Sequence, residues 1–214
     1  VDTCLCMGAG ITMAQGFSHT GKDTVCFSFT GDSTFFASGM TGVINAVYNE
    51  ADTVLCILDN STTAMTGHQP HPGTGRNMMG STVEKADIEG ILRGMGIKDI
   101  LTLDPFDLEK SVEGVREAAG KKGVRAIIFR APCIALTKPE KRAQVDTKRC
   151  TGCKKCIREI GCPALSCIEV KPGESKGAGP ETGSGIRVVI DENLCTGCGL
   201  CESICPFGAI GGKA

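Results

Sequence analysis

Cysteine is the residue type whose spacing most directly predicts chemistry in this sequence. The 214-residue chain contains 14 cysteines, and most of them lie between Cys150 and Cys205. The second of two cysteine clusters reads Cys-x2-Cys-x2-Cys-x3-Cys-Pro from Cys195 to Pro206. In bacterial two-cluster ferredoxins, three thiolates of such a run bind one [4Fe–4S] cluster and the fourth binds the other cluster. The spacing therefore predicts iron–sulfur ligands and an electron-transfer role.

The first cysteine cluster, from Cys150 to Pro163, has the same order, with two extra residues before its last cysteine. We predict one [4Fe–4S] cluster on Cys150, Cys153, Cys156 and Cys205, and a second on Cys195, Cys198, Cys201 and Cys162. Zinc knuckles and disulfides are the alternatives, but a zinc site does not call for two runs that each end in Cys-Pro. Cys167 is left over and is predicted to be a buried packing thiol.

The residues before these clusters alternate strand-like and helix-like patterns. The predicted strands are Val25–Thr30, Val54–Asp59, Ile100–Leu103 and Val124–Arg130, and the predicted helices are Ser38–Asn49, Glu84–Gly94 and Asp107–Ala119. Nearly continuous apolar strands are typical of a parallel sheet that is covered on both faces. The pattern predicts an α/β fold with a doubly wound, mostly parallel sheet.

The composition changes after this region. Pro132 and the polar stretch 137–148 predict a linker, which divides the chain into an α/β domain at 1–140 and a small α+β ferredoxin domain at 141–214. A glycine-rich insertion at 172–185 separates the two cysteine clusters. Because the clusters resemble each other, we expect a domain with internal pseudo-twofold symmetry.

Charge and hydropathy exclude several partner classes. The formal net charge is −1 and the isoelectric point is about 6.4, so nothing favours nucleic-acid or anionic-membrane binding. No apolar run approaches the roughly 20 residues that span a bilayer. We predict a cytoplasmic protein without a membrane or nucleic-acid partner.

Oxygen ligands follow two neighbouring strands of the predicted sheet. Gly31-Asp32-Ser33 follows one strand, and Asn60 and Thr62 follow the next. The carboxylate, the amide and the Thr62 carbonyl would give Mg²⁺ three oxygen ligands and leave positions for diphosphate oxygens. The alternative is that such residues only form turns. A dinucleotide loop at Gly8-x-Gly10 is disfavoured because Met13 occupies the place of the third glycine.

Together these motifs resemble the thiamine-dependent 2-oxoacid:ferredoxin oxidoreductases. The resemblance rests on Gly31-Asp32-Ser33, on Asp59-Asn60 and on the stretch Ala64-Met65-Thr66-Gly67-His68-Gln69, followed by a ferredoxin domain. Within that family the sequence is most similar to the large (alpha) subunits of the indolepyruvate members. The stretch from Asp2 to Gly10 adds to this similarity, which extends over essentially all 214 residues.

The resemblance implies a set of cofactor-binding residues. Asp32 and Asn60 would be Mg²⁺ ligands together with the carbonyl of Thr62, and Thr66 and Gln69 would lie near thiamine diphosphate. Two residues depart from the family pattern. Ser33 replaces the second glycine of GDG, and His68 replaces the second glycine of TGGQ. The second departure makes His68 a candidate pocket residue.

The resemblance also implies an activity and partners. The reaction would be oxidative decarboxylation of an aryl-2-oxoacid, indolepyruvate, to an acyl-coenzyme A, with electrons passing through the two clusters to external ferredoxin. The family's pyrimidine-binding domain lies upstream in the large subunit, and a smaller beta subunit completes the enzyme, so we expect this chain to be an incomplete catalyst by itself. The alternatives are another 2-oxoacid specificity, a thiamine-dependent decarboxylase without redox chemistry, and a non-catalytic electron carrier.

Overall fold

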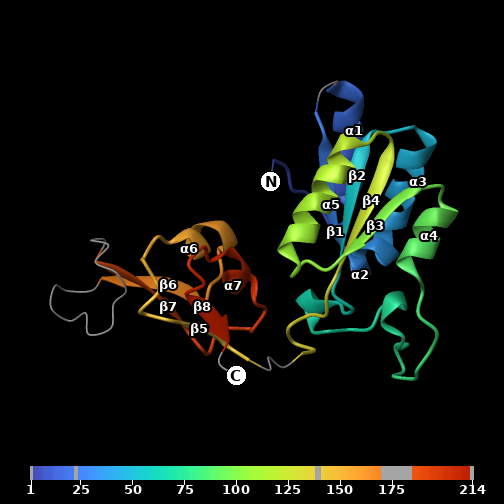
Figure 1. Ribbon diagram of the computed structural model, residues 1–214. Helices are drawn as coiled ribbons and strands as arrows, with labels where there is room; N and C mark the ends of the chain where they lie inside the picture. The colour runs from blue at the N-terminus through green and yellow to red at the C-terminus, as the bar shows by residue number, and fades with distance from the viewer. Residues whose placement is uncertain (1, 22–23, 138–140, 170–184, 213–214) are drawn as a thin grey trace. The chain divides into compact units, whose positions relative to one another are not determined.

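The protein is described here from a computed structural model that covers residues 2–21, 24–137, 141–169 and 185–212. The chain divides into two compact units, Val1–Leu136 and Thr137–Ala214, and each is described by itself (Figure 1). The predicted glycine-rich insertion at 172–185 falls, apart from Gly185, outside the described residues. Within the described ranges, no helix has the length and apolar character needed to cross a membrane.

The first unit contains a four-stranded sheet in which every neighbouring pair of strands is parallel. Its strands are β1 (Cys26–Gly31), β2 (Thr53–Asp59), β3 (Asp99–Leu103) and β4 (Val124–Arg130). The order across the sheet is β1-β2-β4-β3. All four strands therefore end at the same edge, where the loops after β1 and β2 are neighbours.

Helices cover both faces of this sheet, which confirms the doubly wound prediction (Figure 1). The covering helices are α1 (Ala9–Thr20), α3 (Met40–Tyr48), α4 (Ile88–Gly94) and α5 (Leu108–Gly120). On one face, Leu55 and Ile57 of β2 pack against apolar residues of α1, α3 and α4. On the other face, Val54 and Cys56 pack with Ala118 of α5.

The handedness of the strand connections explains why, of the four helices named above, α5 is the one on the opposite face of the sheet. The chain moves across the sheet from β1 to β2 and on to the outer strand β3, with α3 and α4 on one face. It then returns from β3 to β4, in the opposite direction. A right-handed crossover in the reverse direction places its helix on the opposite face, and α5 is found there.

The four predicted strands are confirmed to within one residue at each end. Their apolar runs are buried from both sides; Val54, Ile57 and Ile127, for example, are fully buried. The helix predicted at Asp107–Ala119 is likewise confirmed within one residue, because the side chain of Asp107 caps it by accepting from the backbone N–H of Lys110.

The sequence analysis missed helix α1, whose glycines and hydroxyl residues hide its periodicity. Its residue Ile11 is buried in the main core of the unit. Gly42 of α3 permits close packing of the two helices, since a Cβ placed there would lie 3.2 Å from Ile11 Cγ2 and 3.3 Å from Thr12 Cγ2. Tertiary packing rather than an amphipathic stripe therefore holds α1 in place.

Two predicted helices begin at other residues than expected. The helix predicted from Ser38 starts earlier, with α2 (Asp32–Thr34) and a π-helical turn (Phe35–Gly39) directly before α3. The helix predicted from Glu84 starts only at Ile88, because Asp87 accepts from the N–H groups of the first turn and because the preceding backbone N–H, that of Ala86, donates to Pro72.

The second unit is a small α+β fold with two antiparallel strand pairs. Its elements are β5 (Ala143–Val145), α6 (Lys155–Ile160), β6 (Leu165–Glu169), β7 (Ile186–Ile190), α7 (Leu200–Ile204) and β8 (Ile210–Gly212). β5 pairs with β8, and β6 pairs with β7. Between the pairs, Leu165, Val188 and Ile210 form an apolar core together with cysteines of both clusters.

Backbone hydrogen bonds in this unit repeat between its two halves. The N–H of Cys150 donates to the carbonyl of Asp146 at 3.0 Å, and that of Cys195 donates to Asp191 at 3.0 Å. The bonds across the halves also correspond, since Asp146 N donates to Ala209 O and Asp191 N donates to Ala164 O. The sequence repeat is thus a structural repeat, and each cysteine run begins at an equivalent turn.

Candidate functional site

The loops after β1 and β2 meet at the carboxylate of Asp32. Its Oδ1 accepts from the backbone N–H of Ser33 at 2.7 Å. Its Oδ2 accepts from the N–H of Asn60 at 3.1 Å and from that of Ser61 at 2.8 Å. The structure therefore brings together two of the residues predicted to bind Mg²⁺, and backbone donors on both loops fix the orientation of the carboxylate.

The third predicted ligand, Thr62, is buried close to these groups. Its backbone N–H donates to Oδ1 of Asn60 at 3.1 Å, and its carbonyl accepts from Ala64 at 3.1 Å. A second link joins the loops, because the hydroxyl of Thr63 donates to that of Ser33 at 2.9 Å. Hydrogen bonds from backbone N–H groups therefore link Asp32, Asn60 and Thr62 into one network at the carboxyl edge of the sheet.

His71 also belongs to this site, whereas the sequence predicted His68 as the pocket residue. Its Nε2 lies 3.1 Å from Oδ2 of Asp32, and the two side chains are only 5% and 3% exposed. Nδ1 accepts from the N–H of Gly73 at 3.2 Å, so the ring proton belongs on Nε2. Despite its short distance from Asp32, Nε2 makes no hydrogen bond among the described residues. Nε2 is therefore a buried donor that is paired with Asp32 without a well-aligned hydrogen bond.

The loop with the predicted cofactor residues Thr66 and Gln69 closes on itself. The hydroxyl of Thr66 donates to Oε1 of Gln69 at 2.6 Å, and Nε2 of Gln69 donates to the carbonyl of Thr66. His68 is exposed and has a positive φ of 65°. No hydrogen bond among the described residues joins these three side chains to Asp32, so their cofactor roles stay predictions.

Burial dominates the electrostatics of Asp32. Desolvation raises the pKa of its carboxyl, while the hydrogen bond from Ser33 and the nearby His71 act in the opposite direction. A buried carboxylate of this kind gains from a bound cation, which compensates for lost hydration. The site has the electrostatic character of a cation site.

In the second unit, Cys205 belongs to the second cysteine run in the sequence but lies near the first run in space. Burial raises the pKa of the Cys156 thiol, and the charges of Cys153, Cys205 and Cys150 raise it further. Three thiols of one run and the last thiol of the other therefore interact. These are the four cysteines predicted for the first cluster, and their assignment as its ligands stays a prediction.

The second run shows a comparable grouping. Burial raises the pKa of the Cys201 thiol to about 11, and the charges of Cys198 and Cys195 add to the shift. Cys162 packs against the same apolar core, and its place in this group stays a prediction. Crowded buried thiols become thiolates far more readily when they bind iron, so the donor set fits a cationic cluster.

All 14 cysteines lie within the described residues and are free thiols, which excludes the disulfide alternative in this structure. No group of three or more His, Cys, Asp or Glu within the described ranges has the geometry to hold a single metal ion. A cubane is larger than a single ion and needs its thiolates further apart. Cys167 is exposed, so its prediction as a buried packing thiol was wrong; it lies on β6, whose residues after Leu165 are exposed.

Comparison with protein families identifies the first unit. Residues 2–129 match the family described as "Thiamine pyrophosphate enzyme, C-terminal TPP binding domain". The chain belongs to this family. Thiamine pyrophosphate is the cofactor called thiamine diphosphate above, and the matched range includes both loops that meet at Asp32. Residues 188–211 match a second family, "4Fe-4S binding domain", and contain the Cys195–Cys205 run.

Relatives of this thiamine pyrophosphate domain carry the same two parts. The chain is 40% identical to "Indolepyruvate oxidoreductase subunit IorA" of Archaeoglobus fulgidus over 98% of its own length and 32% of the relative. The IorA subunit of Methanothermobacter marburgensis is also 40% identical, with 98% and 31% covered. The chain is thus homologous to a portion of IorA and spans about a third of the length of these relatives.

A solved structure also resembles the thiamine pyrophosphate domain. It is the "Rhodococcus jostii RHA1 thiamine diphosphate-dependent 4-hydroxybenzoylformate decarboxylase", with a TM-score of 0.45 and 20% identity. The similarity covers 59% of this chain and 23% of that one.

The residues of the site fit the cofactor that defines the family. Carboxylate, amide and carbonyl oxygens are ligands that Mg²⁺ prefers, and the buried Nε2 donor of His71, which makes no hydrogen bond among the described residues, fits an oxygen of an anionic diphosphate. His71 is the site residue that sequence reasoning underrated. The available signal was Pro72, because a residue before proline is held extended, and His71 uses that conformation to cap a short 3₁₀ turn.

Proposed function

We propose that this chain is the cofactor-binding and electron-transfer part of a thiamine-dependent 2-oxoacid:ferredoxin oxidoreductase, with indolepyruvate as its substrate. One observation carries the proposal. A thiamine pyrophosphate-binding domain, with a buried carboxylate at its sheet edge, lies on the same chain as a [4Fe–4S]-binding domain. A decarboxylase without redox chemistry has no use for the second domain. The proposed substrate follows from the names of the IorA relatives, which are indolepyruvate oxidoreductase subunits.

The proposed reaction is a two-electron oxidation. A 2-oxoacid anion and coenzyme A react with two oxidised ferredoxins to give an acyl-coenzyme A, CO₂, one proton and two reduced ferredoxins. When bound, thiamine diphosphate supplies the nucleophile and the electron sink for decarboxylation. The iron–sulfur clusters accept electrons singly, which matches ferredoxin as a one-electron acceptor.

The residues of this chain would hold and orient the cofactor. Asp32, Asn60 and the Thr62 carbonyl would bind Mg²⁺, and Gly31 and Ser33 would allow the diphosphate to approach the start of α2. His71 would donate its Nε2 proton to an anionic oxygen. In the second unit the two groups of four cysteines named above would each bind one cluster. Binding and alignment, rather than proton transfer by this chain, would be its contribution.

The whole enzyme would contain further parts. Because the chain spans about a third of its IorA relatives, we infer that a pyrimidine-binding domain of the large subunit, a smaller beta subunit and external ferredoxin act with it. The 2-oxoacid and coenzyme A would be its small-molecule partners.

Cofactor analysis of the protein, purified without oxygen, tests the proposal. We expect about eight iron atoms, the content of two four-iron clusters, and thiamine diphosphate that is retained only with Mg²⁺. Asp32→Asn should abolish retention of the cofactor, whereas Asp104→Asn, at a loop far along the chain, should not. Iron without thiamine diphosphate in the assembled enzyme would instead identify an electron carrier.

Substrate choice is tested on the assembled enzyme by ferredoxin reduction. Indolepyruvate, phenylpyruvate and pyruvate are compared at equal concentration. We expect the highest kcat/KM with indolepyruvate. A preference for pyruvate would leave the reaction class intact and overturn the substrate assignment.

A further inference from the structure

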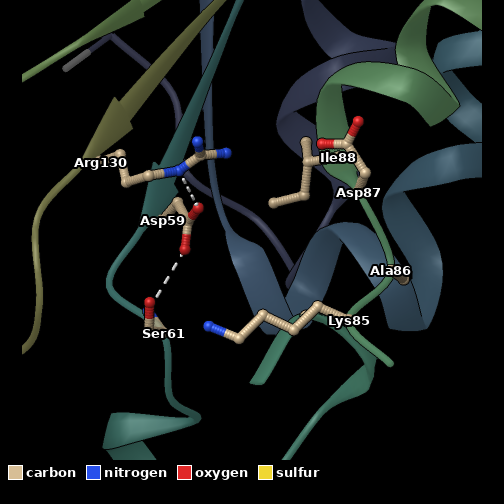
Figure 2. A pocket seen from close by; sticks show the side chains of 8 residues that line it. Asp59, Ser61, Lys85, Ala86, Asp87, Ile88 and Arg130 are labelled. Carbon is tan, nitrogen blue, oxygen red and sulfur yellow. Dashed lines mark hydrogen bonds and ion pairs between the residues drawn. The ribbon is translucent and has the colours of Figure 1, made fainter. Parts of the chain in front are cut away.

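A second pocket lies at the same edge of the sheet, next to the ends of β2 and β4 (Figure 2). It has a volume of ≈ 250 Å³. Its lining includes Asp59, Ser61, Lys85, Asp87, Ile88 and Arg130. Asp32 is not among them, because Asp32 follows β1 and Arg130 ends β4, on opposite sides of β2. The pocket adjoins the proposed Mg²⁺ site, because Ser61 lines it and also donates to Asp32, but it extends away from Asp32 toward Arg130.

Arg130 contributes a fixed guanidinium to this pocket. It is the strand partner of Asp59 across β2 and β4, and its Nε donates to Oδ2 of Asp59 at 2.8 Å. Its two terminal nitrogens have no hydrogen-bond partner in the described part of the chain. Figure 2 shows them beyond the Asp59 pair, on the side where Ile88 lies. A guanidinium held in this way can bind an oxyanion through two parallel N–H hydrogen bonds.

Lys85 contributes a second cation from a well-fixed segment. Its aliphatic stem packs over Gly75, where a Cβ would lie only 3.1 Å from Lys85 Cγ and Cε. The backbone N–H of the next residue, Ala86, donates to the carbonyl of Pro72 at 3.0 Å. In Figure 2 the ammonium extends toward Ser61. No ion pair of Lys85 is found among the described residues.

The two carboxylates of the pocket already have partners. Asp59 accepts from Arg130 through Oδ2 and from the N–H of Ser61, at 3.3 Å, through Oδ1. Asp87 accepts from the N–H groups of Glu89 and Gly90 as the cap of α4. The cationic donors of the pocket, on Arg130 and Lys85, therefore have hydrogen atoms without an acceptor among the described residues. The carboxylate oxygens of Asp59 and Asp87, in contrast, already accept hydrogen bonds. This imbalance favours a ligand rich in acceptors.

We propose that this pocket binds an oxyanion, the carboxylate or phosphate group of a ligand other than the diphosphate cofactor. The anion lies between the guanidinium of Arg130 and the ammonium of Lys85, with the apolar side chain of Ile88 beside it. The inference that an anion binds here does not depend on the reaction proposed above. Its identification with the carboxylate of the 2-oxoacid or with a phosphate of coenzyme A rests on that reaction.

Isothermal titration of the purified chain, with its clusters in place, tests the site. The probes are inorganic phosphate, pyruvate and coenzyme A, and the variants are Lys85→Gln, Arg130→Lys and the control Lys110→Gln. Lys110 is an exposed lysine, paired with Asp107, on α5. We expect the first two to raise the Kd of the best probe about tenfold, as loss of a charged hydrogen bond does, and the control to leave it unchanged.

Two further readouts decide the outcome. Binding of Mg²⁺ and thiamine diphosphate should change less than about twofold in Lys85→Gln, and thermal melting shows whether each variant is folded. Stronger binding of pyruvate assigns a carboxylate, and stronger binding of phosphate and coenzyme A assigns a phosphate group. The proposal is overturned if no probe loses affinity in folded Lys85→Gln and Arg130→Lys. It is also overturned if thiamine diphosphate loses as much affinity as the small anions, because the pocket would then be part of the diphosphate site.

Discussion

The Nε2 atom of His71 lies 3.1 Å from Oδ2 of Asp32, and both side chains are almost fully buried. The backbone N–H of Gly73 donates to Nδ1, which leaves the ring proton on Nε2. Nε2 is paired with Asp32 but makes no well-aligned hydrogen bond among the described residues. We infer that it also donates to an anionic ligand oxygen when one binds beside Asp32.

Replacement of His71 by phenylalanine tests this relationship. Phenylalanine keeps a ring against Phe36, whose centroid lies 5.6 Å from that of His71, and removes the donor. We expect the affinity for thiamine diphosphate with Mg²⁺ to fall about tenfold or more, the effect of one lost hydrogen bond to a charged group. Titration calorimetry measures it. The matched variant is His19→Phe at an exposed position of α1, and equal affinities of the two variants would contradict the role of His71.

The cysteine assignment predicts which substitutions remove a cluster. Cys205→Ser and Cys162→Ser should each lower the iron content from about eight to about four atoms. The two variants should retain different clusters, because each cysteine closes the cluster of the other run. Iron analysis and electron paramagnetic resonance of the reduced protein give the readout. Cys167→Ser, at an exposed free thiol, should keep all the iron, and loss of iron there would refute the assignment.

The backbone at His68 predicts a stabilising substitution. Its φ of 65° lies in the left-handed region, which costs an L-residue roughly 1–2 kcal/mol. Glycine removes this strain but adds about 0.4–1 kcal/mol of chain entropy to the unfolded state. We therefore expect His68→Gly to stabilise the first unit by about 0.5–1 kcal/mol and His68→Val to destabilise it. Chemical denaturation of the two variants gives the sign of each change.

The buried thiol of Cys56 predicts a pattern of alkylation. Burial raises its pKa to about 12, so at pH 8 only about one molecule in ten thousand carries the reactive thiolate. Iodoacetamide should therefore modify the exposed Cys4 and Cys6 and leave Cys56 intact. Mass spectrometry of peptides identifies the modified sites. Rapid labelling of Cys56 in the folded protein would show that the sheet opens far more often than its packing implies.

Local patterns in the sequence determined much of this protein. Strand positions followed from apolar runs, because a strand buried on both faces needs apolar residues at nearly every position, as in Val54–Ile57. Asp32 and Asn60 were predicted to meet because parallel strands end at one edge, and their contact at 3.1 Å agrees. The cysteine spacing predicted [4Fe–4S] chemistry, and the family match over 188–211 agrees for the second run.

Long-range placement could be decided only by the tertiary structure. Helix α1 has no clear periodicity, and close packing against Gly42 holds it. The burial of His71, the exposure of His68 and the exposure of Cys167 depend on how loops and strands fold back over the sheet or away from it. The pocket between Lys85 and Arg130 joins residues from distant segments. Sequence spacing encodes which groups are available, whereas contacts between distant segments arise only when the core brings them together.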